Sequence, residues 1–390
     1  MLENIIDIDK QFVANTYSRF PLLLTHGEGS YVYDKDGKRY IDLGTGIAVN
    51  IFGFCDKEWC NAVSEQLYTL QHASNLYYTA PGAKLAELLC SKTGAKKVFF
   101  SNSGAEANEC AIKVARKWAK DTKGEADYNV ITLKNSFHGR TIATLMATGQ
   151  DVFHKDFGPF PEGFLYCEAN NEAQLEELVK SNKCCAIMME CVQGEGGVLP
   201  LKAEFIKKAE ALCREYGLLL MFDEVQCGNG RCGTLYAYEQ FGVKPDVVTT
   251  AKGLGGGLPI GACMLFDKVE KTLGFGDHGS TFGGNPIAAA GAYNIISRLD
   301  SDMLEGVKER SKIIFDTLSG AEGIKSVSGL GLMIGIETER DASEVIALCM
   351  QDGVLPIKAK TKVRLLPALN IPIEDLKSAL EIIKKHARLG

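Results

Sequence analysis

Between residues 56 and 330, short apolar runs alternate with stretches of helical periodicity, and this alternation constrains the fold more than any other feature. Within the runs, apolar and polar residues do not alternate, which is typical of strands buried on both faces. Such strands, separated by helices, predict an α/β fold with a mostly parallel central sheet covered by helices. The runs are VFF at 98–100, NVITL at 129–133, CAIMME at 185–190, LLLMFDE at 218–224, DVVTTA at 246–251 and GACMLF at 261–266.

The two ends of the chain follow different patterns. Residues 29–43 alternate apolar and polar positions around Asp36-Gly37, which is the turn signal of a β-hairpin. After Pro286, a long helical pattern precedes three apolar runs and a last amphipathic helix, which together predict a smaller α+β domain. Those three runs are GLMIGIE at 331–337, VLPIKA at 354–359 and VRLLP at 363–367.

The length of the chain predicts more than one domain. Its 390 residues exceed the roughly 250–300 residues at which a single hydrophobic core usually stops growing. We expect residues 1–55 to form an N-terminal segment with a β-ribbon that is part of a small domain. We expect residues 56–285 to form a large cofactor-binding domain and residues 286–390 to form the C-terminal small domain.

Charge and cysteine content narrow the class of function. The formal net charge of -6 and the pI of about 5.7 offer no basic surface for nucleic acid or an anionic membrane, so we expect small-molecule substrates. The N-terminal 20 residues mix charges with apolar residues, unlike a signal peptide, and no run approaches the ~18 apolar residues of a membrane span, so we expect a cytoplasmic protein. The 13 cysteines show neither a disulfide framework nor zinc-binding spacing, so we expect reduced thiols and no metal.

Two strand ends carry the strongest local signals for chemistry. One apolar run ends at Asp223 and Glu224, and the next ends directly before Lys252 and a series of glycines. Ligands of open α/β sheets bind outside the carboxyl ends of the strands, where an acid can meet a cofactor cation and a lysine can reach a ligand. Burial would lower the pKa of such a lysine, as Schiff-base chemistry requires. Taken alone, Asp223 is also explained as a helix N-cap and Lys252 as a solvated loop lysine.

A third signal is SNSGAEANE at 101–109, which follows an apolar run and precedes an amphipathic helix. The backbone N–H groups of Gly104 and Ala105 at the start of that helix, with the hydroxyl of Ser103, are suited to holding a phosphate. The alternative is an ordinary helix cap without a ligand.

A fourth signal is SFHGR at 136–140, which follows the run NVITL. Its position would place Phe137 flat against a ring and Arg140 opposite a carboxylate. Each of the four signals is weak alone. Together, a strand-end aspartate, a later strand-end lysine, a phosphate cap and an aromatic strand end form a specific combination.

With these motifs the chain resembles the class III (ω-amino) pyridoxal-phosphate (PLP) aminotransferases of fold type I, from about residue 17 to residue 364. The resemblance implies an aminotransferase with PLP as cofactor and a homodimer with active sites at the interface. The most specific pieces are SNSGAEANE, SFHGR, ECVQGEGG, FDEVQ, AKGLGGGLPIGA and STFGGNP.

The resemblance also implies roles for individual residues. Lys252 would form the Schiff base with PLP and shuttle the proton, Asp223 would pair with the protonated pyridine nitrogen, and Glu190 would lie behind the cofactor. The other implied cofactor residues are Phe137 and Val225 on the two ring faces, Gln226 on the ring hydroxyl, His138 in the same site, Ser103, Gly104 and Ala105 on the phosphate, and Thr281 from the neighbouring subunit.

For the substrates, the resemblance implies two arginines. Arg140 would bind an α-carboxylate. Glu195 would mask Arg364 in one half-reaction and release it in the other. The planar guanidinium of an arginine suits both roles, because it can bind a carboxylate through two hydrogen bonds. The alternative for Glu195 and Arg364 is a permanent structural ion pair. Tyr17 and Ser280 complete the implied substrate site.

Three further stretches bear on the amino donor. DLGTGIAVN at 42–50 and NTYSRFPLLL at 15–24 are similar to the acetylornithine group of the family, and Gly46 lies where ornithine aminotransferases carry a tyrosine. GFCDKEW at 53–59 departs from the GHxHP that the family often has there. The resemblance therefore implies that N2-acetyl-L-ornithine and 2-oxoglutarate give N-acetyl-L-glutamate 5-semialdehyde and L-glutamate, a step of arginine biosynthesis.

Three alternatives stay open. Another ω-amine, such as succinylornithine, N-succinyl-diaminopimelate, ornithine or 4-aminobutyrate, would keep the chemistry and change the pathway. A glutamate 1-semialdehyde aminomutase would need no external oxoacid. A domain retained only for binding or regulation would be expected to lack Lys252 or Asp223, and both are present.

Overall fold

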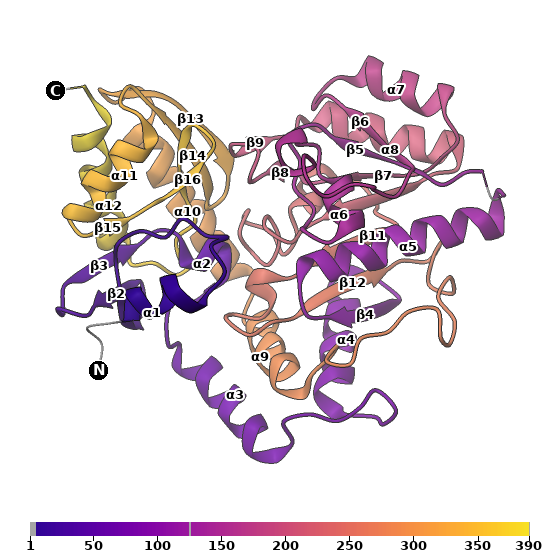
Figure 1. Ribbon diagram of the computed structural model, residues 1–390, viewed down its shortest axis with the longest axis horizontal. Helices are drawn as coiled ribbons and strands as arrows, with labels where there is room; N and C mark the ends of the chain where they lie inside the picture. The colour runs from indigo at the N-terminus through magenta and orange to yellow at the C-terminus, as the bar shows by residue number, and fades with distance from the viewer. Residues whose placement is uncertain (1–4, 125, 390) are drawn as a thin grey trace.

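The computed structural model describes residues 5–124 and 126–389. Figure 1 shows two unequal lobes. The larger lobe contains one large sheet with helices on its faces, and the smaller lobe brings together the N-terminal and C-terminal parts of the chain.

A mixed sheet of seven strands forms the core of the larger lobe. Its strands are β4 (Lys97–Ser101), β5 (Asn129–Leu133), β6 (Phe164–Cys167), β7 (Cys184–Met189), β10 (Leu219–Asp223), β11 (Val247–Thr250) and β12 (Gly261–Leu265). Their order is β4-β12-β11-β10-β7-β5-β6. The neighbours from β11 to β6 pair in parallel, whereas β12 is antiparallel to both β11 and β4. The sheet is therefore mostly parallel, as predicted, and the carboxyl ends of six strands, all except β12, share one edge.

Alternate side chains of the central strands enter two separate apolar clusters. Leu219 and Met221 pack in the cluster that includes α5 (Gly104–Thr122), and Leu220 and Phe222 pack in the cluster that includes α8 (Ala203–Tyr216). Both faces of the sheet are buried, which is why the strands read as uninterrupted apolar runs. The other helices of this lobe are α6 (Ile142–Ala147), α7 (Glu172–Ser181) and the 3-10 turns η1 (Asp151–Phe153), η2 (Ala237–Phe241) and η3 (Lys252–Leu254).

The smaller lobe contains two four-stranded sheets. One has the order β1-β2-β3-β15 and the other β13-β14-β17-β16. The first contains the predicted hairpin, whose turn has Gly37 at φ +81°, a conformation that favours glycine. The strands are β1 (Leu24–Glu28), β2 (Tyr31–Asp34), β3 (Arg39–Asp42), β13 (Ile324–Leu330), β14 (Met333–Thr338), β15 (Val354–Leu355), β16 (Ile357–Ala359) and β17 (Lys362–Leu365), and the helices are α1 (Ile5–Phe12), α2 (Thr45–Ala48), α10 (Ser301–Leu318), α11 (Ala342–Gln351) and α12 (Ile373–Ala387).

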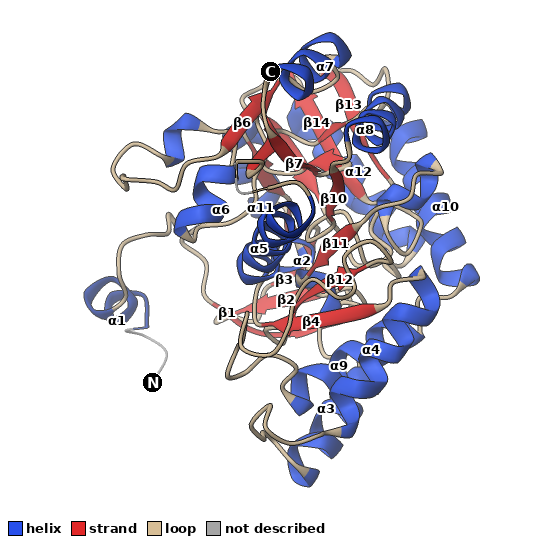
Figure 2. Ribbon diagram, turned by 90° about the vertical axis from the view of Figure 1, so that its right-hand side faces the viewer, coloured by secondary structure: helices blue, strands red, loops and turns tan. Residues whose placement is uncertain are grey.

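Three helices pack together beside the large sheet (Figure 2). They are α3 (Lys57–Thr69), α4 (Ala80–Thr93) and α9 (Pro286–Ser297). Helix α9 belongs to the expected C-terminal domain, yet it packs on α3 and α4, which belong to the expected large domain. The domain boundaries at 55/56 and 285/286 therefore stay a prediction.

The structure adds short strands that the sequence did not indicate. β6 lies at the edge of the sheet and has only four residues, which are too few to show a clear pattern of apolar positions. β8 (Val192–Gln193) and β9 (Leu199–Pro200) form a small antiparallel pair.

All 13 cysteines are free thiols. Over the described residues, no group of three or more His, Cys, Asp or Glu side chains is placed to hold a metal ion. Within the same residues, no helix has the length and apolar character needed to cross a membrane.

Candidate active site

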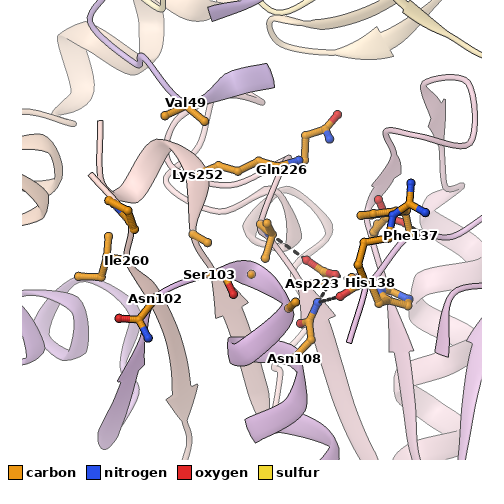
Figure 3. Close-up of a pocket in the computed structure, with 18 of the residues that line it drawn as sticks. Val49, Asn102, Ser103, Asn108, Phe137, His138, Asp223, Gln226, Lys252 and Ile260 are labelled. Atoms are coloured by element: carbon orange, nitrogen blue, oxygen red, sulfur yellow. Dashed lines mark hydrogen bonds and ion pairs between the residues drawn. The ribbon is translucent and has the colours of Figure 1, made fainter. Parts of the chain in front are cut away.

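A pocket of about 410 Å³ opens at the carboxyl ends of β10 and β11 and the start of α5. Figure 3 shows side chains from these elements converging on it. Its lining is mostly apolar with a few convergent polar groups, which is the usual character of a small-molecule site. Eleven predicted site residues line it: Ser103, Gly104, Ala105, Phe137, His138, Arg140, Glu190, Asp223, Val225, Gln226 and Lys252.

Lys252 begins the turn that follows β11, and in Figure 3 its side chain extends across the pocket toward Gln226. Its φ of +46° lies in the left-handed region that non-glycine residues rarely adopt, and such strain is concentrated at functional sites. The next residue has to be small, because a Cβ at Gly253 would lie 2.4 Å from Cδ1 of Ile51. Burial lowers the pKa of the Lys252 ammonium, and nearby carboxylates, Glu195 first, oppose this only in part. The amine is therefore easier to deprotonate than an ordinary lysine.

Asp223 ends β10 and is 3% exposed. Its Oδ2 accepts a hydrogen bond from Asn108 Nδ2 at 2.8 Å and lies 2.8 Å from His138 Nδ1. Its Oδ1 accepts the backbone N–H of Val225 at 3.0 Å. Burial disfavours a charged His138, but the hydrogen bond to Asp223 outweighs it and raises the pKa of the imidazole. A carboxylate surrounded by donors is stabilised in its charged form.

Glu224, next to Asp223, has a structural role. Its two carboxylate oxygens accept the backbone N–H groups of Ala237 at 3.0 Å and Tyr238 at 2.8 Å, at the start of η2. The helix-capping alternative given for Asp223 therefore applies to its neighbour Glu224 instead, whereas Asp223 faces the pocket.

Ser103 caps α5. Its Oγ accepts the backbone N–H of Glu106 at 3.2 Å and donates to the carboxylate of Glu106 at 2.9 Å. The first two N–H groups of the helix, on Gly104 and Ala105, have no carbonyl one turn back, so together with the helix dipole they suit an anion. A Cβ at Gly104 would lie 2.6 Å from Cγ1 of Val225, so this position has to be glycine for Val225 to reach the pocket.

Phe137 and Arg140 lie on the side of the pocket formed by the loop after β5. The backbone N–H of Phe137 donates to Glu190 Oε1 at 2.9 Å. The Arg140 guanidinium stacks 4.1 Å from the centre of the Phe153 ring and 5.5 Å from that of Phe137. Burial raises the pKa of Glu190 to about 7. Arg140 is exposed and free to meet an anion at the pocket mouth.

Glu195, Gln226 and Arg364 form a chain of polar contacts beside the pocket. Arg364 Nη1 lies 2.7 Å from Glu195 Oε1 and donates to Gln226 Oε1 at 3.0 Å, while Gln226 Nε2 donates to Glu195 at 3.2 Å. Arg364 is 2% exposed, and its Nε has no partner in the described part of the chain. Burial raises the pKa of Glu195, but Arg364 outweighs it and the net shift is downward. The predicted ion pair between Glu195 and Arg364 is thus formed. Both of its members contact Gln226, the residue expected at the ring hydroxyl of the cofactor.

Five predicted residues do not line this pocket in the single chain: Glu195 and Arg364 lie beside it, next to Gln226, and the other three are Tyr17, Ser280 and Thr281. Tyr17 is 72% exposed, and the Arg19 guanidinium lies over its ring. Thr281 is exposed and Ser280 is half-buried, and Ser280 Oγ accepts a hydrogen bond from Asn102 at 3.1 Å. Their roles stay predictions, and Thr281 was expected to act in a neighbouring subunit.

Two polar residues of the site were missed by sequence reasoning. Asn108 lies in the quoted motif SNSGAEANE but received no role, and Thr249 lies inside an apolar strand run. The signal that could have found them was a polar side chain at a position expected to be buried, where the helix at 104–122 packs against the strand at 247–250.

The sequence matches the class-III aminotransferase family over residues 12–387. The chain belongs to this family. Acetylornithine aminotransferase from Haemophilus ducreyi is 48% identical over 383 residues, covering 98% of each chain. The enzyme of the same name from Methanocaldococcus jannaschii is 41% identical over 387 residues, covering 98% of this chain and 97% of its own.

Solved structures agree with the family assignment. N-acetylornithine aminotransferase from Stenotrophomonas maltophilia has a TM-score of 0.85 at 36% identity and covers 98% of each chain. Ornithine aminotransferase from Toxoplasma gondii has a TM-score of 0.94 at 31% identity and covers 99% of this chain and 94% of its own. The fold is therefore that of fold type I, and this class-III aminotransferase is a PLP-dependent enzyme.

The pocket residues fit this cofactor. The start of α5 offers donors for a phosphate, the carboxylate of Asp223 is held as an acceptor, and Lys252 has a lowered pKa. The packing of Val225 on Gly104 leaves a place for a flat ring opposite Phe137. When bound, PLP supplies an electron sink for the carbon that exchanges its amine.

Proposed function

We propose that this class-III aminotransferase transfers the δ-amine of N2-acetyl-L-ornithine to 2-oxoglutarate, giving N-acetyl-L-glutamate 5-semialdehyde and L-glutamate in arginine biosynthesis. The observation that carries the proposal is sequence identity of 41–48% over nearly the full chain to relatives named acetylornithine aminotransferase. Structural similarity does not separate this donor from ornithine, because enzymes of both names superpose on the chain. Free thiols and the biosynthetic role favour action in the cytoplasm.

We assign the chemistry to the residues around the pocket. Lys252 holds the cofactor and, as a neutral amine, takes up and returns the proton of the carbon that bears the transferred amine. Asp223 keeps a positive charge on the pyridine nitrogen. Phe137 and Val225 bound the ring on its two faces, and the N–H groups at the start of α5 bind the phosphate.

The segment around Gly46 supports an acylated donor. Gly46 has a φ of +64°, and Ile47 and Ala48 have similar positive values, so a side chain at position 46 would be strained. Nothing lies closer than 3.7 Å to a Cβ built at Gly46. Val49, at the end of the same segment, lines the pocket. The absence of a side chain at Gly46 is consistent with room for an N-acyl group.

Both substrates bring carboxylates, and two arginines lie at the pocket to receive them. Arg140 is held by its stacking on Phe153, which leaves its N–H groups free for a carboxylate. Arg364 is paired with Glu195 in the absence of substrate. We propose that Glu195 covers Arg364 while the acylated amine is bound and that the second carboxylate of 2-oxoglutarate or glutamate displaces it.

Glu195→Gln is expected to act unequally on the two half-reactions. Removing the charge leaves Arg364 free for dicarboxylates, so amination of 2-oxoglutarate should be retained, whereas the acetylornithine half-reaction should slow by about 10-fold, in line with the loss of a charged hydrogen bond. Stopped-flow absorbance of the bound cofactor measures each half-reaction. Glu322→Gln is the matched control, since its pair with Arg388 is exposed and worth little. Equal slowing of both half-reactions would identify a permanent structural ion pair.

The amino donor is tested by mixing the holoenzyme separately with acetylornithine, succinylornithine, ornithine and 4-aminobutyrate. We expect acetylornithine to convert the cofactor to its amino form fastest and 2-oxoglutarate to reverse the conversion. Faster conversion by another amine would replace the proposed donor. No conversion by any of them, together with isomerisation of glutamate 1-semialdehyde without added oxoacid, would favour the aminomutase.

We also propose a homodimer in which Thr281 reaches the partner's phosphate site. Asn75 Nδ2 donates to the carbonyls of Ser280 and Gly283, both at 3.0 Å, so the segment after Asn75 lies beside Thr281. This region exposes the apolar side chains of Leu76, Tyr77, Tyr78 and Phe282. Large exposed apolar surfaces mark interfaces. Light scattering should give twice the chain mass of 42.4 kDa, and a monomeric holoenzyme with full activity would contradict the proposal.

A further inference from the structure

Four buried polar side chains form one hydrogen-bonded network; Asn108, His138 and Asp223 line the pocket, and Thr249 lies behind them. Thr249 Oγ1 donates to Asn108 Oδ1 at 2.6 Å, and Asn108 and His138 both contact Asp223 Oδ2 at 2.8 Å. Each of the four is at most 3% exposed. Figure 3 shows Asn108 and His138 on the side of Asp223 away from Lys252. The network therefore joins α5, β11 and the loop after β5 to the end of β10.

The strand period explains why Thr249 lies there. Val247, two residues earlier on β11, packs in the same apolar cluster as α5. Side chains two apart on a strand share a face, so Thr249 also faces α5. Asn108 lies in the second turn of that helix. This strand thus carries the threonine, and the lysine of the site follows three residues later, in the turn after the strand.

The direction of each hydrogen bond is fixed by chemistry. Asn108 Nδ2 is 2.8 Å from the backbone carbonyl of His138, which can only accept. The amide nitrogen must therefore face that carbonyl and Asp223, and the amide oxygen must face Thr249. Thr249 must then donate its proton, and this hydrogen bond holds the amide oxygen of Asn108 in place.

This arrangement determines what Asp223 presents to the pocket. Asn108 and, through its Nδ1–H, His138 donate to Oδ2, while Val225 donates to Oδ1. These three donors use three of the roughly four acceptor positions of a carboxylate, so one position on Oδ1 stays free for a further donor. An ionised carboxylate with one free acceptor position suits a protonated ring nitrogen.

We propose that Thr249 and Asn108 are positioning residues that hold the Asp223 carboxylate in place and aim it at the pyridine nitrogen of the cofactor, an inference that rests on the role proposed above for Asp223. Neither residue touches the reacting atoms in this proposal. They act through the carboxylate of Asp223. Removing either side chain should therefore weaken PLP binding and lower kcat together, with little effect on substrate binding.

Thr249→Val tests this pair because it removes the hydroxyl and keeps the shape, leaving Asn108 Oδ1 buried without its donor. We expect the dissociation constant for PLP, measured by titrating the apoenzyme, to rise about 10-fold, the size of one lost buried hydrogen bond. The value of kcat should fall about 10-fold with the KM values nearly unchanged. Thr249→Ser, which keeps the hydroxyl, should restore both, and Thr249→Ala replaces the valine variant if that variant does not fold.

Thr132→Val is the matched control. Thr132 is also fully buried, on β5 of the same sheet, and its hydroxyl has no hydrogen-bond partner among the described residues. We expect this variant to keep its PLP affinity and kcat. The thermal midpoint of each apoenzyme separates effects on folding from effects on the site.

The outcomes separate this proposal from the proposed function. If Thr249→Val matches Thr132→Val in PLP affinity and kcat while Asp223→Asn loses most of its turnover, the positioning role is wrong and the role of Asp223 stands. If serine at position 249 fails to restore what valine removes, the hydroxyl is not the cause and the positioning role is wrong. If Asp223→Asn keeps normal turnover and PLP affinity, the role proposed for Asp223 falls.

Discussion

Lys252→Ala is expected to abolish turnover, with kcat reduced by a factor on the order of 10⁴, the upper end of what a positioned general base contributes. The substitution removes the amine that holds the cofactor and moves the substrate proton, and no other lysine lines the pocket. The visible absorbance of the covalently held cofactor should disappear as well. Steady-state assays and absorbance spectra of the purified variant measure the two effects.

A matched lysine variant and a rescue experiment identify the cause. Lys271→Ala removes a lysine that is 91% exposed, and it should behave as wild type. A small primary amine added to Lys252→Ala should restore part of the turnover, because it replaces the missing base without replacing the side chain. If Lys252→Ala kept both the absorbance and the turnover, another group would carry the chemistry.

Asp223→Asn is expected to lower kcat by about 10²–10³, the typical effect of removing one preorganised electrostatic group from an active site. The two donors at Oδ2, from Asn108 and His138, require the amide oxygen of the variant on that side. Its NH₂ group then replaces Oδ1, where it opposes the N–H of Val225 and offers a donor to the ring nitrogen. The ring would lose its positive charge, so the variant should fold and still turn over slowly.

The control for Asp223→Asn is Asp246→Asn. Asp246 precedes β11, and its carboxylate accepts the N–H of Leu220 at 2.9 Å, away from the pocket. We expect Asp246→Asn to keep kcat. A PLP analogue with a methylated pyridine nitrogen carries its own positive charge, so it should recover activity in Asp223→Ala more than in wild type. A near-normal rate for Asp223→Asn would mean that another group holds the nitrogen.

Much of the fold could be predicted because its strands are buried on both faces. The run at 129–133 coincides with β5, and the run at 246–251 contains β11, since both faces of those strands are buried and most of their side chains are apolar. The reversed direction of β12 could not be predicted, because an apolar run carries no sign of its direction. The edge strand β6 was missed, because four residues are too few to show a period.

The site was predictable where one residue type performs a recognisable task at a strand end. Asp223 and Lys252 have such positions, and Arg364 and Glu195 were paired through the family resemblance and are 2.7 Å apart in the structure. The role of Asn108 could not be predicted, because the two side chains that it joins, Asp223 and Thr249, are more than 100 positions away in the chain. The stacking of Arg140 on Phe153 likewise depends on an irregular loop that no local pattern specifies.

Reduction of the holoenzyme with borohydride, followed by proteolysis and mass spectrometry, tests the central claim most directly. Borohydride makes the link between PLP and its lysine permanent, so the labelled peptide identifies that lysine. We predict a single phosphopyridoxyl group on Lys252, and its loss when acetylornithine is added before the reductant. A label on another lysine, or a label that acetylornithine does not remove, would contradict this account.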